Sequence, residues 1–336
     1  MNYVQATAEL AKKDFARARR AAIVAMLLRF VRGRQNDLLP FEDVRSRLFI
    51  RGQYDRGVQS VPVAKIVGSQ GRATDFDRFF RPMNNATEQR WKSIMHARYR
   101  DVELPPIELY KLSDIYFVRD GNHRVSVARR QGAVELDAYV IELTTDVPLN
   151  AELFAQDLTG KEEQSDFLEW TNLAQMRPSH NIQVTEPGGY LDLIGDINRQ
   201  RRDLSHERAE EITPEEAIAG WYDTVYMPVV AAMRHWGMPQ AFPRRTEADL
   251  YLAVMSHRQM LVERCGQAVE IDLVVGDFMC HYGPRWVRLF SKRLAYSISA
   301  GGSAPDQAAT SGGADGEWHW LGMRRLWRAL RRERTR

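Results

Sequence analysis

Residues 4–32 form the first clear pattern along the chain, because they are rich in Ala, Leu, Arg and Lys. These are good helix formers, so the segment predicts one long helix. From Ala21 to Val31 it is apolar except for Arg29, but this stretch is shorter than the roughly 20 residues that a membrane-spanning helix needs. The helix is expected either to dock on the body of the protein or to lie on a membrane surface or a partner helix.

Residues 60–145 alternate between short strands and helices. Strands are predicted at 61–66, 107–112, 115–118 and 136–143, with a tight turn at Ser113-Asp114. Asn85 and Glu88 have the spacing of a capping box, which predicts a helix that runs to about Tyr99. A shorter helix is predicted from Asn122 to Gln131, followed by Gly132. The alternation indicates a small mixed α/β domain.

Residues 150–295 are mostly helical in pattern. Thr213-Pro214-Glu215-Glu216 places a cap, a first-turn proline and a capping-box glutamate in order, and Thr246 begins another helix. Trp221, Tyr222 and Tyr226 could provide a stacking surface for a base, but their helical spacing favours packing in a core. The predicted fold class is therefore α+β, with a long N-terminal helix and a mostly helical C-terminal domain.

The changes in pattern predict five segments. These are an N-terminal helical segment at 1–57, a mixed α/β domain at 58–148, a mainly helical domain at 149–298, a flexible linker at 299–316 and a basic tail helix at 317–336.

Composition narrows the class of protein. The chain has 336 residues, of which 44% are hydrophobic and 27% charged, as in an ordinary globular protein. Its two cysteines, Cys265 and Cys280, exclude a disulfide scaffold and a four-thiolate zinc site. The sequence shows no secretory signal at its start, so we expect a cytoplasmic protein.

Charge is unevenly distributed along the chain. The net charge is +3 overall, but +6 over residues 1–35 and +5 over residues 317–336, which leaves −8 between them. This distribution is compatible with a local affinity of the two ends for anionic lipid or for nucleic-acid phosphates, but it predicts no affinity of the whole chain for nucleic acid.

The tail carries Trp320, Met323, Trp327 and Leu330 on one predicted helix face. The tail residues predicted to make contacts are Trp320, Arg324, Arg325, Trp327, Arg328, Arg331 and Arg332. Such a helix fits an anionic membrane surface, to which it would bind peripherally, but also nucleic-acid phosphates, a partner groove or a solvated tail.

The segment from Ile115 to Gly132 carries the most chemistry. A predicted strand ends in Asp120-Gly121-Asn122-His123-Arg124, and a helix begins there. Glycine lets the chain turn sharply, and the helix start presents free N–H groups together with a dipole that favours negative charge. His123 and Arg124 add side-chain donors. The pattern predicts either a phosphate cradle or an ordinary strand–turn–helix with exposed polar residues.

These residues resemble a known superfamily. Asp120-Gly121-Asn122-His123-Arg124 and the following Val-Ser-Val-Ala-Arg-Arg-Gln-Gly look like the signature helix of the ParB N-terminal and sulfiredoxin superfamily. The segment from Val61 to Ser69, with Arg72 nearby, resembles the opening strand and arginine of that superfamily. The resemblance covers about residues 58–145.

The resemblance implies a pocket for a nucleoside triphosphate, CTP or ATP, with Mg²⁺. Its implied nucleotide contacts are Gly68, Ser69, Arg72, Gly121, Asn122, His123 and Arg124. Asp120 and His123 are the implied catalytic pair, with Asp120 holding a metal, orienting His123 or acting as a base. The resemblance leaves open a homodimer and a role as NTPase or small-molecule kinase.

Two departures from the superfamily restrict the function. Sulfiredoxins carry a cysteine where this chain has Asn122, so reduction of a sulfinic acid is not expected. No convincing helix-turn-helix follows residue 150, which makes chromosome segregation doubtful. The segments 212–230 and 242–252 resemble an uncharacterised bacterial family joined to the same ParB-like unit. Three functions stay open. The first is an enzyme or switch that hydrolyses the nucleotide or transfers a phosphoryl group, and the second is a regulatory protein that senses the nucleotide or another anion and uses its basic ends to contact DNA, RNA or membrane. The third is a degenerate pocket that serves only as a scaffold.

Overall fold

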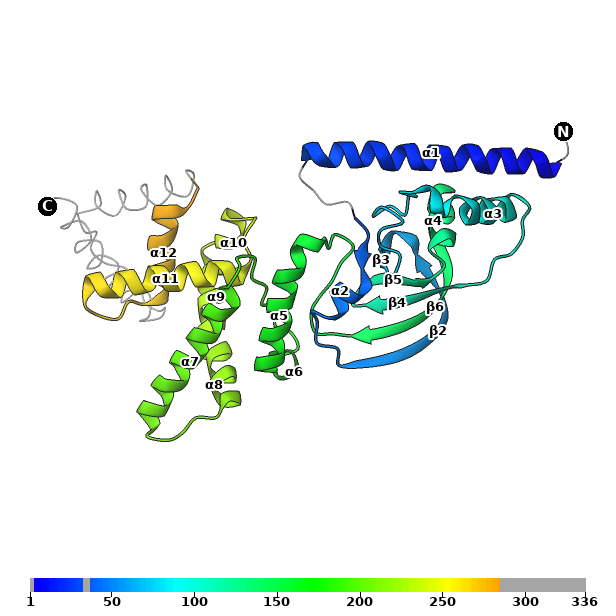
Figure 1. The fold of residues 1–336 in the computed structure, drawn as a ribbon. Coiled ribbons are helices and arrows are strands. Elements are labelled where there is room, and N and C mark those ends of the chain that lie inside the picture. The colour runs from blue at the N-terminus through cyan, green and yellow to red at the C-terminus, as the bar shows by residue number, and fades with distance from the viewer. Residues whose placement is uncertain (1–2, 33–36, 285–336) are drawn as a thin grey trace, which may run out of the picture. The chain divides into compact units, whose positions relative to one another are not determined.

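The computed structural model describes residues 3–32 and 37–284, without the side chains of residues 3 and 26–32 (Figure 1). The chain forms two compact units, at residues 1–178 and 179–336. The first strand of the sheet lies before residue 58, and the first unit continues past residue 148. The predicted linker and tail lie outside the described residues.

The first unit contains one six-stranded mixed sheet, which confirms the α+β class in general. Its strands are β1 (Leu39–Pro40), β2 (Gly52–Pro62), β3 (Ile66–Ser69), β4 (Ile107–Leu112), β5 (Ile115–Asp120) and β6 (Glu135–Thr144), in the order β1-β3-β5-β4-β6-β2. Its helices are α1 (Tyr3–Arg32), α2 (Phe41–Arg45), α3 (Glu88–Tyr99), α4 (Asn122–Arg130), α5 (Leu158–Thr171) and α6 (Leu173–Met176), with short 3₁₀ turns η1 (Val63–Lys65), η2 (Asn85–Thr87) and η3 (Ala155–Asp157).

Strands β1, β3 and β5 run parallel, whereas β4 is antiparallel to β5 and parallel to β6. Because β3 and β5 are parallel neighbours, the segment that follows β3 and the start of α4 leave the sheet at the same edge. That segment, residues 70–84, sends Phe76 and Phe80 into the core formed by one face of the sheet and α4. On the other face, the ring of Phe41 in α2 stacks on Tyr110.

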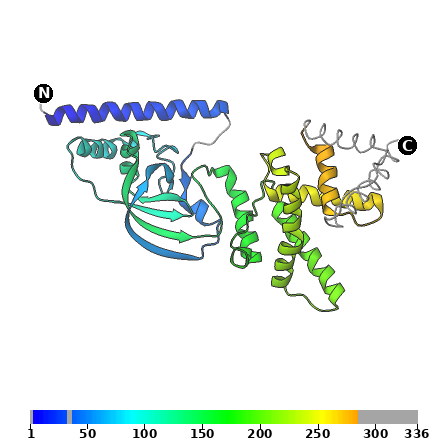
Figure 2. The ribbon, with the colours of Figure 1, turned by 180° about the vertical axis from the view of Figure 1, so that it is seen from behind.

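Helices α3 and α4 cover the sheet, and α1 lies along them (Figure 1, Figure 2). Phe15 of α1 packs edge-on against Trp91 of α3, which is fully buried. The Trp91 indole Nε1 donates a hydrogen bond to Ser126 Oγ in α4 at 2.8 Å. Trp91 of α3 therefore links α1 to α4, through apolar packing on one helix and a satisfied hydrogen bond to the other.

The second unit is helical in its described part, residues 179–284. Its elements are α7 (Gly189–Arg208), α8 (Pro214–Gly220), the π-helical turn η4 (Trp221–Tyr226), α9 (Met227–His235), α10 (Met238–Ala241), α11 (Glu247–Cys265) and α12 (Ile271–Tyr282). The capping box at Thr213 is confirmed, with both reciprocal hydrogen bonds present. Trp221, Tyr222 and Tyr226 are buried, which confirms core packing over an exposed stacking surface.

Two local predictions are wrong. The chain at 61–66 is not one strand: β2 ends at Pro62, η1 follows and β3 begins at Ile66. Arg129 of α4 stabilises this break, because its guanidinium donates to the carbonyls of Val63 (2.8 Å) and Ile66 (2.7 Å). The capping box at Asn85 and Glu88 is also absent, since the Asn85 Oδ1 accepts from Arg19 of α1 instead.

Other predicted elements are confirmed, namely the long N-terminal helix, the paired strands around Ser113-Asp114 and the helix before Gly132. Gly132 has φ +75°, a left-handed conformation that glycine adopts without strain.

Gly68 in β3 allows the closest approach within the sheet, which generates our first prediction. A Cβ at Gly68 would lie 2.3 Å from Phe117 Cδ1 and 2.4 Å from the Leu39 carbonyl oxygen. We expect Gly68→Ala to lower the free energy of unfolding by at least about 2 kcal/mol, because neither neighbour can move without disturbing the sheet. Urea denaturation measures the effect.

Gly160→Ala is the matched control. Gly160 lies in α5, and a Cβ added there would meet no atom within 4 Å, so the change should be neutral or stabilise by up to about 1 kcal/mol. Equal effects of the two substitutions would contradict the assignment of Gly68 to close packing.

Candidate functional site

The turn between β5 and α4 can be built only with glycine at position 121. Gly121 has φ +107° and ψ 19°, and a Cβ there would lie 2.6 Å from Ile107 Cγ2. Because glycine has no side chain, α4 begins without a side-chain cap. Its first backbone N–H groups, which lack partners within the helix itself, are therefore available to an acceptor from outside the helix.

Asn122 and His123 are the first two residues of α4, and both are buried. They are 5% and 7% exposed. Within the described part of the chain, neither the Asn122 Oδ1 nor the His123 Nδ1 has a hydrogen-bond partner, although both atoms are buried. The His123 ring packs edge-on against Phe76 at 5.3 Å between centroids. Buried polar atoms are normally paired, so these two call for a water or ligand partner.

The segment after β3 brings Arg72 to the same place. Arg72 Nη1 donates to Asp75 Oδ2 at 3.1 Å, and Asn84 Nδ2 donates to Asp75 Oδ1 at 3.0 Å. Asp75 directly precedes Phe76, whose ring contacts that of His123, so Arg72 and Asp75 lie near the start of α4, and their charges act on the pKa of His123. The structure thus brings Arg72 and His123, two residues that the resemblance implies for the site, into one neighbourhood.

The electrostatic field at His123 is positive. Burial is the main cause that lowers the pKa of His123 to about 4; the guanidinium groups of Arg72 and Arg90 act in the same direction, and Asp75 opposes them. The imidazole is therefore neutral at neutral pH. A positive field around neutral hydrogen-bonding groups favours an anionic ligand.

Arg90 is absent from the residues that the sequence predicted for this site. It lies in the first turn of α3, where the helix dipole disfavours a cation. That mismatch is the one signal that could have drawn attention to it.

Arg124 has three acceptors within the protein. Its Nη1 donates to the carbonyls of Pro105 (2.6 Å) and Pro106 (2.8 Å), and its Nη2 to Asp120 Oδ2 (2.5 Å). The side chain of Asp120 is 62% exposed and pairs with Arg124. In this structure Arg124 thus fixes the chain that enters β4, and the Asp120 carboxylate is engaged by the same guanidinium.

Gly68 and Ser69 lie inside the sheet. Ser69 is fully buried, and its Oγ lies within hydrogen-bonding distance of the carbonyls of Gln70 (3.3 Å) and Val118 (3.4 Å). Their described contacts are those of packing between β1, β3 and β5, rather than of residues that face a ligand.

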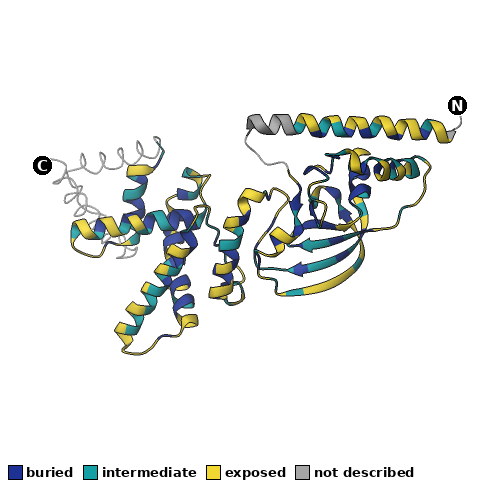
Figure 3. Cartoon of the chain, in the orientation of Figure 1, coloured by how far each residue is buried: buried dark blue, intermediate teal, exposed yellow. Residues whose placement is uncertain are grey.

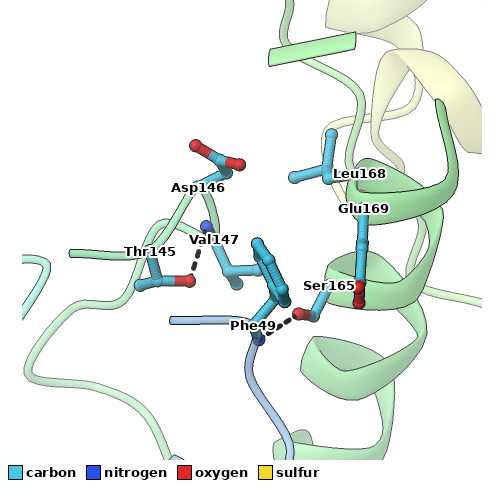
Figure 4. A pocket seen from close by; sticks show the side chains of 7 residues that line it. All are labelled: Phe49, Thr145, Asp146, Val147, Ser165, Leu168 and Glu169. Atoms are coloured by element: carbon cyan, nitrogen blue, oxygen red, sulfur yellow. Dashed lines mark hydrogen bonds between the residues drawn. The ribbon is translucent and has the colours of Figure 1, made fainter. Parts of the chain in front are cut away.

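A separate hollow lies between Phe49, the segment 145–147 and α5 (Figure 4). It leaves no room for a molecule even as large as water, so it does not have the dimensions of a ligand pocket. The backbone N–H of Phe49 donates to Ser165 Oγ at 2.8 Å, so this contact joins α5 to the sheet. We therefore interpret the hollow as imperfect packing between these segments rather than as a binding site.

Membrane-spanning helices and metal clusters are both absent from the described residues. None of the helices in those ranges combines the length and apolar character needed to cross a bilayer. Within the same ranges, no group of three or more His, Cys, Asp or Glu side chains is arranged to hold a metal ion.

Comparison with protein-family models, with curated proteins and with solved structures finds no match for this chain.

The buried, neutral His123 generates a prediction about pH. The pKa of His123 in the folded protein is about 4, below the ordinary value of 6.5. Between pH 4 and pH 6.5 the His123 imidazole is therefore protonated more fully in the unfolded chain than in the folded protein. Its contribution to stability is therefore complete above pH 6.5 and decreases as the pH falls toward 4. Between about pH 7.5 and about pH 5, wild-type protein should lose about 2 kcal/mol more stability than His123→Gln.

Urea denaturation of both proteins at the two pH values checks this difference. The subtraction removes the contributions of all other titrating groups that the two proteins share. Parallel pH dependences would show that His123 is not held neutral by the fold.

Proposed function

We propose that residues 58–148 are a ParB N-terminal/sulfiredoxin-like domain that binds a nucleoside triphosphate, CTP or ATP, by its phosphates at the start of α4. One observation carries this proposal. Among the described residues, the buried Nδ1 of His123, which can donate in one neutral tautomer, has no hydrogen-bond partner and lies at a helix start that has no side-chain cap. The unpartnered Asn122 Oδ1 can only accept, so it would pair with water or with an N–H group of the nucleotide rather than with a phosphate oxygen. A phosphate oxygen would accept hydrogen bonds from the exposed end of the helix and add its charge to the favourable side of the helix dipole.

The positively charged side chains near His123 favour a ligand that carries several negative charges. Arg72 and Arg90 act on His123 from the segment after β3 and from α3, respectively, against the single opposing charge of Asp75. Both arginines are exposed and can move toward a ligand. We therefore assign the guanidinium contacts with phosphate to Arg72 and Arg90.

Arg124 takes a positioning role in this proposal. Its contacts with Pro105, Pro106 and Asp120 hold the turn at Gly121 in the conformation that opens the helix start. Replacing it would disturb the site indirectly, so a loss of binding in that variant would not identify a phosphate contact.

Mg²⁺ would be held mainly by the phosphates and water, as is usual for nucleotide-bound magnesium, with Asp120 as the nearest exposed carboxylate along the chain. The metal would screen the charge of the phosphate chain. Such a protein would work in the cytoplasm, where nucleoside triphosphates are abundant.

The geometry favours binding over turnover. The Asp120 carboxylate is paired with Arg124, and His123 is neutral with a pKa of about 4, which is a poor match for a base at neutral pH. The proposed role is therefore that of a nucleotide-responsive binding protein, and hydrolysis or phosphoryl transfer is an outcome that the following experiment detects.

Calorimetric titration tests the proposal. The full chain is titrated with ATP, CTP, GTP and UTP in the presence of Mg²⁺, and we expect micromolar binding of ATP or CTP. Arg72→Gln should weaken that binding about tenfold, because a hydrogen bond to a charged group contributes roughly 1.5–3 kcal/mol. Release of inorganic phosphate from the same mixtures reports turnover.

Arg100→Gln provides the matched control. Arg100 is an exposed arginine at the opposite end of α3 from Arg90, and its replacement should leave nucleotide affinity unchanged. Absence of heat with all four nucleotides, from protein shown to be folded by circular dichroism, would refute the proposal. An equal loss in both variants would show that the effect is one of overall charge.

A further inference from the structure

The two sides of α1 have different characters. One side carries Ala11, Phe15, Ala18 and Ala22, all at most 5% exposed, of which Ala11, Phe15 and Ala18 pack in one cluster with Trp91 and Met95 of α3. The opposite side is exposed over residues 4–25, as the coloured part of the helix in Figure 3 shows. The buried side explains how α1 packs on α3. It does not explain which residues occupy the exposed side.

The exposed side is strongly basic. Lys12, Lys13, Arg17 and Arg20 are all exposed, and none forms a salt bridge or side-chain hydrogen bond with another described residue. Lys13, Arg17 and Arg20 are spaced by four and three residues, which places them on one line of the helix over about 10 Å. Asp14 and Glu9 are the acids of α1, and Asp14 is engaged by Tyr99 and Arg130.

One exposed apolar side chain continues this basic line. Val24 follows Arg20 by four residues and is 54% exposed. Its neighbour Ile23 is 42% exposed and lies about a quarter of a turn away around the helix. Basic side chains beside exposed apolar ones suit the interface of an anionic bilayer, which offers both negative charge and an apolar layer.

We propose that the exposed side of α1 binds the surface of a membrane that contains anionic lipids, with the helix lying in the plane of the interface. Lys13, Arg17 and Arg20 would contact the lipid phosphates and carboxylates, and Ile23 and Val24 would enter the acyl boundary. A nucleic acid would bind the three cations only, and Ile23 and Val24 would stay exposed to water. The interface of an anionic bilayer can contact both the cations and the apolar side chains, so we favour a membrane over a nucleic acid as the partner.

Sedimentation with lipid vesicles tests this surface in the full-length chain. Wild-type protein should bind vesicles of phosphatidylcholine and phosphatidylserine and should not bind phosphatidylcholine alone. The triple variant Lys13→Gln, Arg17→Gln, Arg20→Gln should bind the anionic vesicles about a hundredfold more weakly, since each basic residue near an anionic surface strengthens binding roughly fivefold. Val24→Gln should also weaken binding, by about threefold to tenfold, if α1 enters the acyl boundary.

The control variant Arg202→Gln, Arg208→Gln, Arg264→Gln changes the net charge by the same amount. These arginines are exposed in α7 and α11, and the control should bind vesicles like the wild type. Thermal melts establish that each variant is folded. Because the nucleotide titration reports a different site, failure of one proposal leaves the other standing.

Three results would overturn the membrane surface. The first is absence of wild-type binding to anionic vesicles. The second is equal binding by wild type and the α1 triple variant, which would place the contact elsewhere in the chain. The third is tight binding of a short DNA duplex that the α1 triple variant loses while vesicle binding is absent, which would assign the cations to nucleic acid.

Discussion

The parallel pairing of β3 with β5 is the constraint on which the candidate site depends. It makes both strands leave the sheet at one edge, so that Arg72 and Asp75 come next to the start of α4. The pairing tolerates no side chain at Gly68, where the Leu39 carbonyl and the Phe117 ring approach the backbone. Gly68, which the resemblance implies as a nucleotide contact, is therefore needed for the packing of β1, β3 and β5. The arrangement of the site depends on that packing.

Burial and charge act together on His123. Its ring is held in the core by Phe76, which makes protonation unfavourable, and the neighbouring guanidinium groups make it more so. The site therefore combines neutral donors and acceptors with exposed cations. An anion can enter such a site without displacing a proton, whereas a cation would meet the repulsion of Arg72 and Arg90.

Helix α1 carries two different sets of side chains on its two sides. Its small buried residues allow close packing on α3, and the Asp14 carboxylate fixes the helix by hydrogen bonds from Tyr99 and Arg130. Because docking uses only this side, Lys12, Lys13, Arg17 and Arg20 form no salt bridge or side-chain hydrogen bond with the described residues, although the charge of Arg17 acts on Asp14. A helix that packs on its own domain with one side and carries basic residues on the other can hold that domain at an anionic membrane surface.

The sequence determined the elements whose signals are local. The paired strands around Ser113-Asp114, the glycine turn before α4 and the capping box at Thr213 all follow from neighbouring residues. The resemblance also implied that Arg72 lies near His123. The tertiary structure decided what depends on residues distant in sequence. Arg129 interrupts the expected strand at Val63, and Arg90 joins the site from another helix. Arg124 finds its acceptors at Pro105 and Pro106, because a long side chain bonds whatever carbonyls the fold brings within reach.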